Sequence, residues 1–436
     1  MKQGRLDENA SLSGALGLVL ILAALNIVNY MDRALMAIMA QPIKNDLELT
    51  DVEIGLLTGF AFALVYSLLA LPLSRFIDRG NHKTVILVST GVWSVMTALG
   101  GFAHNFWMLV VMRIGVAIGE AGLHPASHSL ISLRLAPSSR GRALAIFSVG
   151  LPAGVGLGSI LGGWLADDYG WRWGFFVFGP LGLLMLPLAW LLVPSTKDML
   201  RPPTAVRQGA GDYKRGGYLL PALRTLWKDR VFRCLFIGQA VISMFGFALT
   251  TFSAAFFMRV HGWTALEAGS FIAVANGLAG SVGLLAGGAV FDLAMKRWPA
   301  QALRPVVVAL VVSGICAPIG WLSPSAQVST VCGVIAAFLY LVAAVPTTAM
   351  AQTIAPPDMR ATSSALITLS ASLLGATAGP LMAGAISDAL APRLGAHALA
   401  WSLTAVSLMQ IVGAIFYWLA NREYAARHRR ALASAA

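Results

Sequence analysis

Long apolar runs dominate the pattern of the chain. Runs of about 20 mainly apolar residues, the length that crosses a bilayer as a helix, recur along nearly the whole sequence and are separated by short polar segments. This pattern predicts twelve membrane-spanning helices, near residues 15–40, 52–74, 84–103, 106–134, 141–166, 172–194, 231–258, 266–292, 304–323, 328–355, 360–388 and 396–420.

Composition agrees with this interpretation. Hydrophobic residues make up 57% of the chain and charged residues 11%, whereas a soluble protein carries about 25% charged residues. We therefore expect an all-α membrane protein. The first apolar run is long and contains Asp32 and Arg33, so it is interpreted as a retained helix rather than a cleaved signal peptide. The three cysteines lie in apolar stretches without metal-ligand spacing, and we expect them to be free.

Lysine and arginine gather in alternate loops. With the N-terminus inside, 24 basic residues fall on the cytoplasmic side and four outside, and the excess marks the cytoplasmic side. The sequence thus predicts a multi-pass protein of the cell inner (plasma) membrane with both termini in the cytoplasm. The net charge of +12 is then mainly a topology signal, and no nucleic-acid partner is expected.

Three regions are expected from the spacing of the spans. Residues 1–194 form an N-terminal six-helix bundle, residues 195–230 a cytoplasmic central loop, and residues 231–436 a C-terminal six-helix bundle with a short basic tail. Within the loop, "LLPALRTLWKDR" is either a short amphipathic helix on the inner leaflet or a solvated linker.

The two halves repeat each other. "TDVEIG" begins at Thr50 and "TALEAG" at Thr264, an offset of 214 residues, and each T-x-x-E is a capping box that satisfies backbone donors at a helix start. A second alignment, at offset 220, pairs Arg140 with Arg360 and Asp168 with Asp388. Several matches in order predict duplication of a six-helix unit.

Glycines on the fifth and eleventh spans have helical spacing. Gly154, Gly158 and Gly162 lie four residues apart, and Gly375 and Gly379 repeat this interval. No strand precedes either run, so we expect helix-packing faces rather than a dinucleotide site.

Four charges lie inside predicted spans: Asp32, Arg33, Arg113 and Glu120. An unpaired charge at the membrane centre costs about 2.5–3.5 kcal/mol on the insertion scale, so an idle charge is not expected. At 1.5 Å per residue, Asp32 and Arg113 both lie about 10–12 Å below the outer surface and can pair. Glu120 lies on the same helical face about 10 Å deeper. A purely structural salt bridge is the alternative.

Neighbours of these charges complete the polar wall. Arg33 is about 100° around the helix from Asp32, so we expect it to make an interhelical or gate contact, with Asn29 one turn away. His124 and His128 continue from Glu120 at four-residue intervals. No third ligand accompanies them, so a polar lining is predicted and neither a metal nor another cofactor is expected.

The C-terminal half is more apolar. Phe245 and Phe252 lie in its first span, and no charge comparable to Arg113 occurs there. A substrate with a polar head beside Arg113 and a tail against this half would use both. The spans contain no H-E-x-x-H or G-x-S-x-G motif, so no enzyme is predicted.

The twelve spans, the six-plus-six repeat and "SRFIDRGNHK" together resemble the major facilitator superfamily, whose signature is G-x-L-x-D-R-x-G-R-K. Ser74, Asn81 and His82 depart from it. The resemblance implies the two-bundle major facilitator fold and alternating access. Residues expected to form the cytoplasmic gate, alongside Arg33, are Asp78, Arg79, Arg134, Arg140, Asp292 and Arg360. Their alternative role is that of ordinary solvated helix ends.

"NYMDR", "RIGVAIGEA" and "IDRGNHK" resemble the Spinster branch, which is associated with lysolipid and sphingolipid export. The resemblance implies that Asp32, Arg113 and Glu120 are the coupling and substrate residues. We expect Asp32 and Glu120 to couple protons, and Arg113 to bind the substrate together with Asn29, His124, Phe245 and Phe252. "GLHPASH" after Ala121 is instead similar to organic anion symporters of the same superfamily.

The expected partners are membrane lipids, protons and a small amphipathic substrate, and the protein is expected to act as a monomer. Two alternatives stay open: a proton-coupled symporter of small organic anions, and a membrane receptor or scaffold that does not transport.

Overall fold

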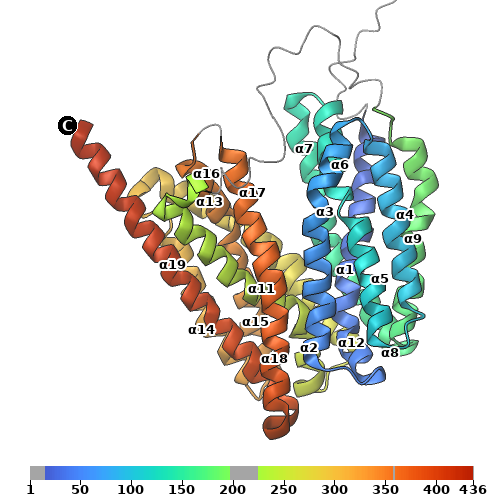
Figure 1. Ribbon diagram of the computed structural model, residues 1–436. Helices are drawn as coiled ribbons and strands as arrows, with labels where there is room; N and C mark the ends of the chain where they lie inside the picture. The colour runs from blue at the N-terminus through green and yellow to red at the C-terminus, as the bar shows by residue number, and fades with distance from the viewer. Residues whose placement is uncertain (1–14, 197–223, 357–358, 436) are drawn as a thin grey trace, which may run out of the picture. The chain divides into compact units, whose positions relative to one another are not determined.

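The computed structural model describes residues 15–196, 224–356 and 359–435, and all regular elements there are helices (Figure 1). In the first half they are α1 (Leu16–Asp46), α2 (Asp51–Gly55), η1 (Leu56–Phe60), α3 (Ala61–Asp78), α4 (His82–Gly100), α5 (Phe106–Glu120), α6 (Leu123–Arg134), α7 (Pro137–Ser148), α8 (Gly150–Asp168) and α9 (Trp171–Leu192).

The second half repeats this order. Its helices are α11 (Arg230–His261), α12 (Ala265–Ile272), η2 (Ala273–Ala279), α13 (Gly280–Arg297), η3 (Pro299–Gln301), α14 (Arg304–Leu322), α15 (Ala326–Val342), α16 (Ala344–Ile354), α17 (Arg360–Leu369), η5 (Ser370–Gly375), α18 (Ala376–Leu394), η6 (Gly395–His397) and α19 (Ala398–Ala435). Of the predicted central loop, residues 224–227 are helical, and the remainder of "LLPALRTLWKDR" before Arg224 lies outside the described residues.

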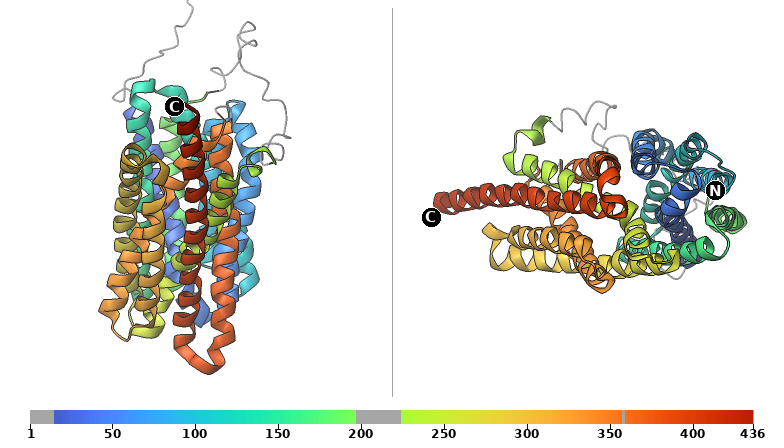
Figure 2. Two further views of the ribbon diagram at one scale, coloured as in Figure 1. Left: turned by 90° about the vertical axis from the view of Figure 1, so that its left-hand side faces the viewer. Right: turned by 90° about the horizontal axis from the view of Figure 1, so that it is seen from below.

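The predicted membrane spans are confirmed. Eleven helical stretches of the described chain are long and apolar enough to cross a bilayer. The last of them, Thr362–Arg430, contains a reversal of direction: α18 and α19 pack against each other and are joined by η6 (Figure 1 and Figure 2). Counting this stretch as two gives the twelve spans that the apolar pattern predicts.

The described chain divides into two compact units. Unit 1 comprises residues 15–48, 61–196 and 264–273, and unit 2 comprises residues 49–60, 224–263, 274–356 and 359–435. The division therefore differs from the expected split in two places. The segment with α2 and η1 belongs to unit 2, and α12 belongs to unit 1, because α2 packs on α18 and α12 packs on α8.

Carboxylates hold both of these helix starts. Thr50 and Thr264 each complete the predicted capping box with the glutamate three residues on. In addition, Asp388 accepts hydrogen bonds from the backbone N–H groups of Asp51 and Val52 at 2.9 and 2.8 Å. Charge at a helix N-terminus is favourable because the backbone donors there lack helical partners.

The equivalent carboxylate of the first half is Asp167. Its two oxygens accept from the N–H groups of Ala265 and Leu266 at 2.9 and 2.8 Å, whereas Asp168 accepts no such bond among the described residues. The predicted pairing of Asp168 with Asp388 is therefore wrong by one residue. Asp167 and Asp388 perform the same task at an offset of 221.

Interruptions of the helices also recur in both halves. A π-helical segment follows α2 and another follows α12. A short break at residues 121–122 separates α5 from α6, and one at Ala343 separates α15 from α16. Val149 separates α7 from α8, and the π-helical η5 separates α17 from α18. Such segments bend helices and often lie at functional sites.

Each unit has its own apolar core. Trp93 and Phe147 are among the fully buried side chains of unit 1, and Phe232 and Tyr417 among those of unit 2. The Tyr417 hydroxyl donates to Gln239 Oε1 at 3.0 Å. At the edge of unit 2, Asp229 caps α11 and binds Arg427 through both oxygens, at 2.6 and 2.8 Å. Burial raises the pKa of Asp229, but the bonds from Arg427 and the backbone outweigh it and the pKa is lowered.

Glycine faces bring helices into close contact, as the spacing predicts. A Cβ atom on Gly154 would lie 2.5 Å from Ile27 O and 2.5 Å from Tyr30 Cβ of α1. Gly375 and Gly379 likewise press against α11 at Ser243 and Met244. Small residues at such crossings allow backbones to approach closely.

We expect Gly154→Ala to lower the stability of unit 1 by about 1–3 kcal/mol, because the added methyl group overpacks the contact between α1 and α8. Gly156→Ala is the matched control on the same helix, since its Cβ would lie 3.9 Å from the nearest atom, in Ala273. Thermal unfolding of the two variants in detergent measures the difference. Equal melting temperatures would show that the crossing has room for a side chain.

Candidate functional site

The four charges of the sequence prediction meet inside unit 1, between α1 and α5. Arg113 Nη1 lies 3.8 Å from Asp32 Oδ2, so the two groups pair as their depths predict. The other oxygen of Asp32 accepts a hydrogen bond from Thr97 Oγ1 of α4 at 2.7 Å. Only 5% of the Asp32 side chain and 10% of the Arg113 side chain are exposed. Three helices therefore fix this carboxylate.

A second ion pair lies beside the first. Arg33 Nε donates to Glu120 Oε2 at 2.6 Å, and Glu120 has no exposed side-chain surface. The interhelical role expected for Arg33 is present, but Glu120 pairs with Arg33 rather than with Arg113. Arg33 lies about 100° around the helix from Asp32. Its long side chain nevertheless reaches Glu120.

Aromatic rings lie beside both guanidinium groups. The Arg33 guanidinium carbon lies 5.3, 5.0 and 5.1 Å from the ring centres of Tyr30, Phe62 and Tyr66. The guanidinium carbon of Arg113 lies 4.6 Å from the centre of Phe62. Electron-rich ring faces stabilise cations that have left water. Phe62 therefore contacts both arginines, a role that its place in an apolar run does not reveal.

The charges balance, but the hydrogen bonds do not. Two carboxylates and two guanidinium groups give no net charge, yet each retains a buried atom without a hydrogen-bond partner in the described chain: Asp32 Oδ2, Arg33 Nη2, Arg113 Nε and Glu120 Oε1. Both side-chain polar atoms of Asn29 are in the same condition, and so is His124 Nε2. Most buried polar groups in proteins are satisfied, so this cluster has the capacity to bind additional polar groups.

The histidines lie at the edge of this cluster. The His124 ring makes edge contacts with Tyr30 and Phe147, both at 5.6 Å between centres, and His128 also contacts Phe147. Within the described residues, no group of three or more His, Cys, Asp or Glu side chains is placed to hold a metal. His124 thus packs among aromatic rings, one of which, Tyr30, also lies beside the Arg33 guanidinium group.

The space beside the first ion pair is small. A cavity of about 20 Å³ is lined by Asp32, Thr97, Arg113 and neighbouring apolar side chains. About 10–15 Å³ of such space holds one water molecule. In this conformation the cavity therefore has room for about one water molecule.

The predicted gate residues are not joined by ion pairs in the described chain. Asp78 and Arg79 are exposed at the end of α3. Arg140 Nε instead donates to Leu135 O at 2.9 Å, and Arg134 Nε is buried without a hydrogen-bond partner. In unit 2, Asp292 and Arg360 are both exposed. The structure therefore does not bring either set together.

The two candidate phenylalanines lie within unit 2. Phe245 is 2% exposed and packs edge-on against Tyr340 at 5.6 Å, and Phe252 has no exposed surface. They form part of the packed interior in this conformation. Neither ring lines an open surface in this conformation.

Sequence reasoning missed one strong polar cluster, which lies in unit 2. Asp51 is 2% exposed and binds Arg259 Nη1 and Nη2 at 2.7 and 2.6 Å. Ser387 Oγ donates to the same carboxylate at 2.6 Å. In the sequence, Asp51 directly follows the capping residue Thr50, and Arg259 falls among the basic residues of the outer loops. Neither position therefore indicates a buried ion pair. A bidentate pair of this kind is geometrically specific.

The chain is similar to membrane transporters of known families. Residues 22–380 match the sequence profile of the Major Facilitator Superfamily. An MFS-type efflux pump of Mycolicibacterium smegmatis is 35% identical over 408 residues, which are 93% of this chain and 92% of that protein. A probable L-galactonate transporter of Escherichia coli is 26% identical over 284 residues, or 64% of this chain and 61% of that protein.

One solved structure is similar along nearly its whole length. It is the crystal structure of a bacterial homolog to the human lysosomal transporter Spinster, in an inward-facing and unoccupied conformation. Its TM-score is 0.82 at 28% sequence identity, and the match covers 95% of this chain and 98% of that chain.

Removal of one partner of the second ion pair should lower stability strongly. Arg33→Met or Glu120→Gln alone leaves a buried group without its partner, and we expect each to cost about 3–5 kcal/mol. The double variant should cost less than the sum, because neither charge is then left unpaired. Unfolding of the four proteins of this cycle in mixed micelles measures the coupling.

The half-exposed pair of Arg172 and Asp46, at 2.8 Å, is the control. Its coupling should stay near or below about 1 kcal/mol, as for other exposed pairs. A coupling between Arg33 and Glu120 that is no larger than this would contradict the buried-pair interpretation.

Proposed function

Since the chain belongs to the major facilitator superfamily and is a multi-pass membrane transporter rather than an enzyme, we propose that it is a proton-coupled secondary transporter of an amphipathic, lipid-like substrate. The substrate is of lysolipid or sphingoid type, and it moves by alternating access. The observation that carries the proposal is the balanced pair of buried ion pairs in unit 1, in which every member keeps a buried polar atom without a partner.

Proton binding would act directly on this balance. A proton on Asp32 would neutralise the carboxylate that pairs with Arg113. The Arg113 guanidinium group could then form an ion pair with an anionic group instead. Arginine binds phosphate or carboxylate through a planar fork. A substrate head group and the ionised Asp32 therefore compete for Arg113. Glu120 stands in the same relation to Arg33, so its protonation would release a second cation and the gate contact of Arg33.

A lipid-like substrate is favoured by the Spinster-type relative of known structure and by the apolar C-terminal unit. Arg113 would bind the head group together with Asn29 and His124, whose side chains also carry buried polar atoms without a hydrogen-bond partner. Phe245 and Phe252 would contact the tail once α11 moves. Similarity to an efflux pump favours outward movement of the substrate.

A small organic anion is the second candidate. The sugar-acid transporter relative of Escherichia coli favours it, as does "GLHPASH" after Ala121. Arg113 would serve the same purpose for a carboxylate, and the apolar unit would then contribute only packing.

The gate, location and assembly complete the proposal. Asp78 and Arg79 with Arg134 and Arg140, and Asp292 with Arg360, would pair when the cytoplasmic side closes. The protein would work as a monomer in the plasma membrane with both termini in the cytoplasm, without a nucleic-acid partner or cofactor. Counterflow of solute in proteoliposomes separates this carrier from a receptor or scaffold that does not transport.

Asp32→Asn should abolish uptake driven by a pH gradient while the protein remains folded. The amide keeps an oxygen that can accept from Thr97 but cannot exchange a proton at neutral pH. Exposed Asp168 provides the control: Asp168→Asn should transport normally. Uptake by Asp32→Asn that still follows the pH gradient would refute coupling through this residue.

Affinity should rise with chain length across a series of lysolipids or sphingoid phosphates with one head group. Each buried methylene contributes about 0.8 kcal/mol, or up to about fourfold in the dissociation constant. Arg113→Ala should remove the preference for anionic over neutral heads while leaving the chain-length trend. Transport of a short sugar acid by vesicles in which lysolipids are inert would favour the second candidate instead.

A further inference from the structure

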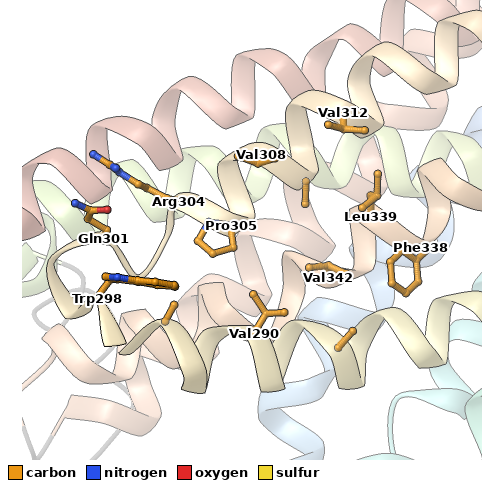
Figure 3. Close-up of a pocket in the computed structure, with 13 residues that line it drawn as sticks. Val290, Trp298, Gln301, Arg304, Pro305, Val308, Val312, Phe338, Leu339 and Val342 are labelled. Carbon is orange, nitrogen blue, oxygen red and sulfur yellow. The ribbon is translucent and has the colours of Figure 1, made fainter. Parts of the chain in front are cut away.

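A long apolar groove lies on the surface of unit 2. It has a volume of about 650 Å³ and runs between α13, α14 and α15 (Figure 3). Val290, Val308 and Val312 line it and are 38%, 61% and 45% exposed. Exposed valines on membrane-spanning helices face lipid rather than water, so the groove opens toward the hydrocarbon of the bilayer.

Polar side chains occupy one end of the groove only. Figure 3 shows Trp298, Gln301 and Arg304 together at that end, with Phe338, Leu339 and Val312 at the other. Trp298 is 57% exposed, and tryptophan is enriched where membrane and water meet. From Arg304 to Val312 the groove follows α14 for about 12 Å. Its shape and polarity fit an acyl chain below a head group.

A second pocket continues from this polar end. It has a volume of about 300 Å³, shares Gln301 and Arg304 with the groove, and is also lined by Asn421, Arg422 and Arg429 of α19. The three arginines are exposed, and none forms an ion pair with a carboxylate among the described residues. Glu423 lies nearby, but its Oε2 is 4.0 Å from Arg230 Nη1 of α11.

We propose that the groove and the adjoining pocket form one binding site for an anionic phospholipid of the bilayer. The phosphate lies among Arg304, Arg422 and Arg429, and one acyl chain follows the groove past Val308. The occupant is a phospholipid rather than a free anion, because the arginine pocket is continuous with an apolar groove that a free anion would leave empty. In the proposed orientation this lipid belongs to the cytoplasmic leaflet.

Native mass spectrometry of the delipidated full-length protein tests the site. The protein is titrated with phosphatidylglycerol and with phosphatidylcholine of the same chains. The unmodified protein should retain one phosphatidylglycerol molecule at least tenfold more tightly than phosphatidylcholine. Arg304→Gln, Arg422→Gln and Arg429→Gln combined should remove this preference. Equal binding of the two lipids by the unmodified protein would overturn the proposal.

Matched variants separate charge, groove and substrate site. Arg429→Gln alone should weaken binding, whereas Arg430→Gln, its exposed neighbour on α19, should not. Val308→Trp fills the groove and should weaken binding, whereas Val331→Trp should not, because exposed Val331 of α15 lies outside the lining. Gel filtration checks that each variant is folded. If the triple variant does not fold, Arg429→Gln and Val308→Trp test the lipid site instead.

The unit 1 site provides the last comparison. Arg113→Ala should leave retention of phosphatidylglycerol unchanged, since Arg113 lies in neither pocket. Loss of the lipid in Arg113→Ala with retention in the triple variant would place the lipid at the proposed transport site and overturn the assignment. The readout requires no transport, so it stands or falls separately from the proposed function.

Discussion

Neutralisation of charge within unit 1 is the constraint on which the remaining features depend. Hydrocarbon cannot solvate a carboxylate, so Asp32 and Glu120 are compatible with the apolar helices α1 and α5 only beside Arg113 and Arg33. The same requirement explains the aromatic rings around the guanidinium groups and the bond from Thr97. A proton added to either carboxylate would leave one guanidinium group of this balanced set without an opposing charge.

The sequence predicts the spans and the repeat well because both depend on properties that are local along the chain. Apolar length identifies a span, and Thr50 with its glutamate identifies a helix start. The depth of Asp32 and Arg113 follows from residue counting, so their pairing is also predictable. The partner of Glu120 is not, because it depends on how far the Arg33 side chain reaches around its helix. Phe245 and Phe252 illustrate the same limit: composition does not say whether a ring lines a cavity or fills a core.

The two halves share a plan but not its chemistry. Asp388 and Asp167 cap equivalent helix starts, yet Asp51, with its bidentate bond to Arg259, corresponds to Ala265 in the other half. The interior of α11, from Cys234 to Met258, and the whole of α15 contain no charged residue, unlike α1 and α5. The caps are needed wherever a helix begins in this fold, so both copies keep them. The ion pairs of Asp32 with Arg113 and of Glu120 with Arg33 occur in the first copy only, among the described residues.

The π-helical η5 lies where the two halves of the repeat differ in length by one residue. Arg140 and Arg360 are 220 residues apart, whereas Asp167 and Asp388 are 221 apart, so the later copy contains one more residue between these landmarks. A π-helical turn accommodates an extra residue without ending the helix, and η5 lies within this interval. η5 can therefore accommodate the one-residue difference in spacing between the two halves within a continuous helix.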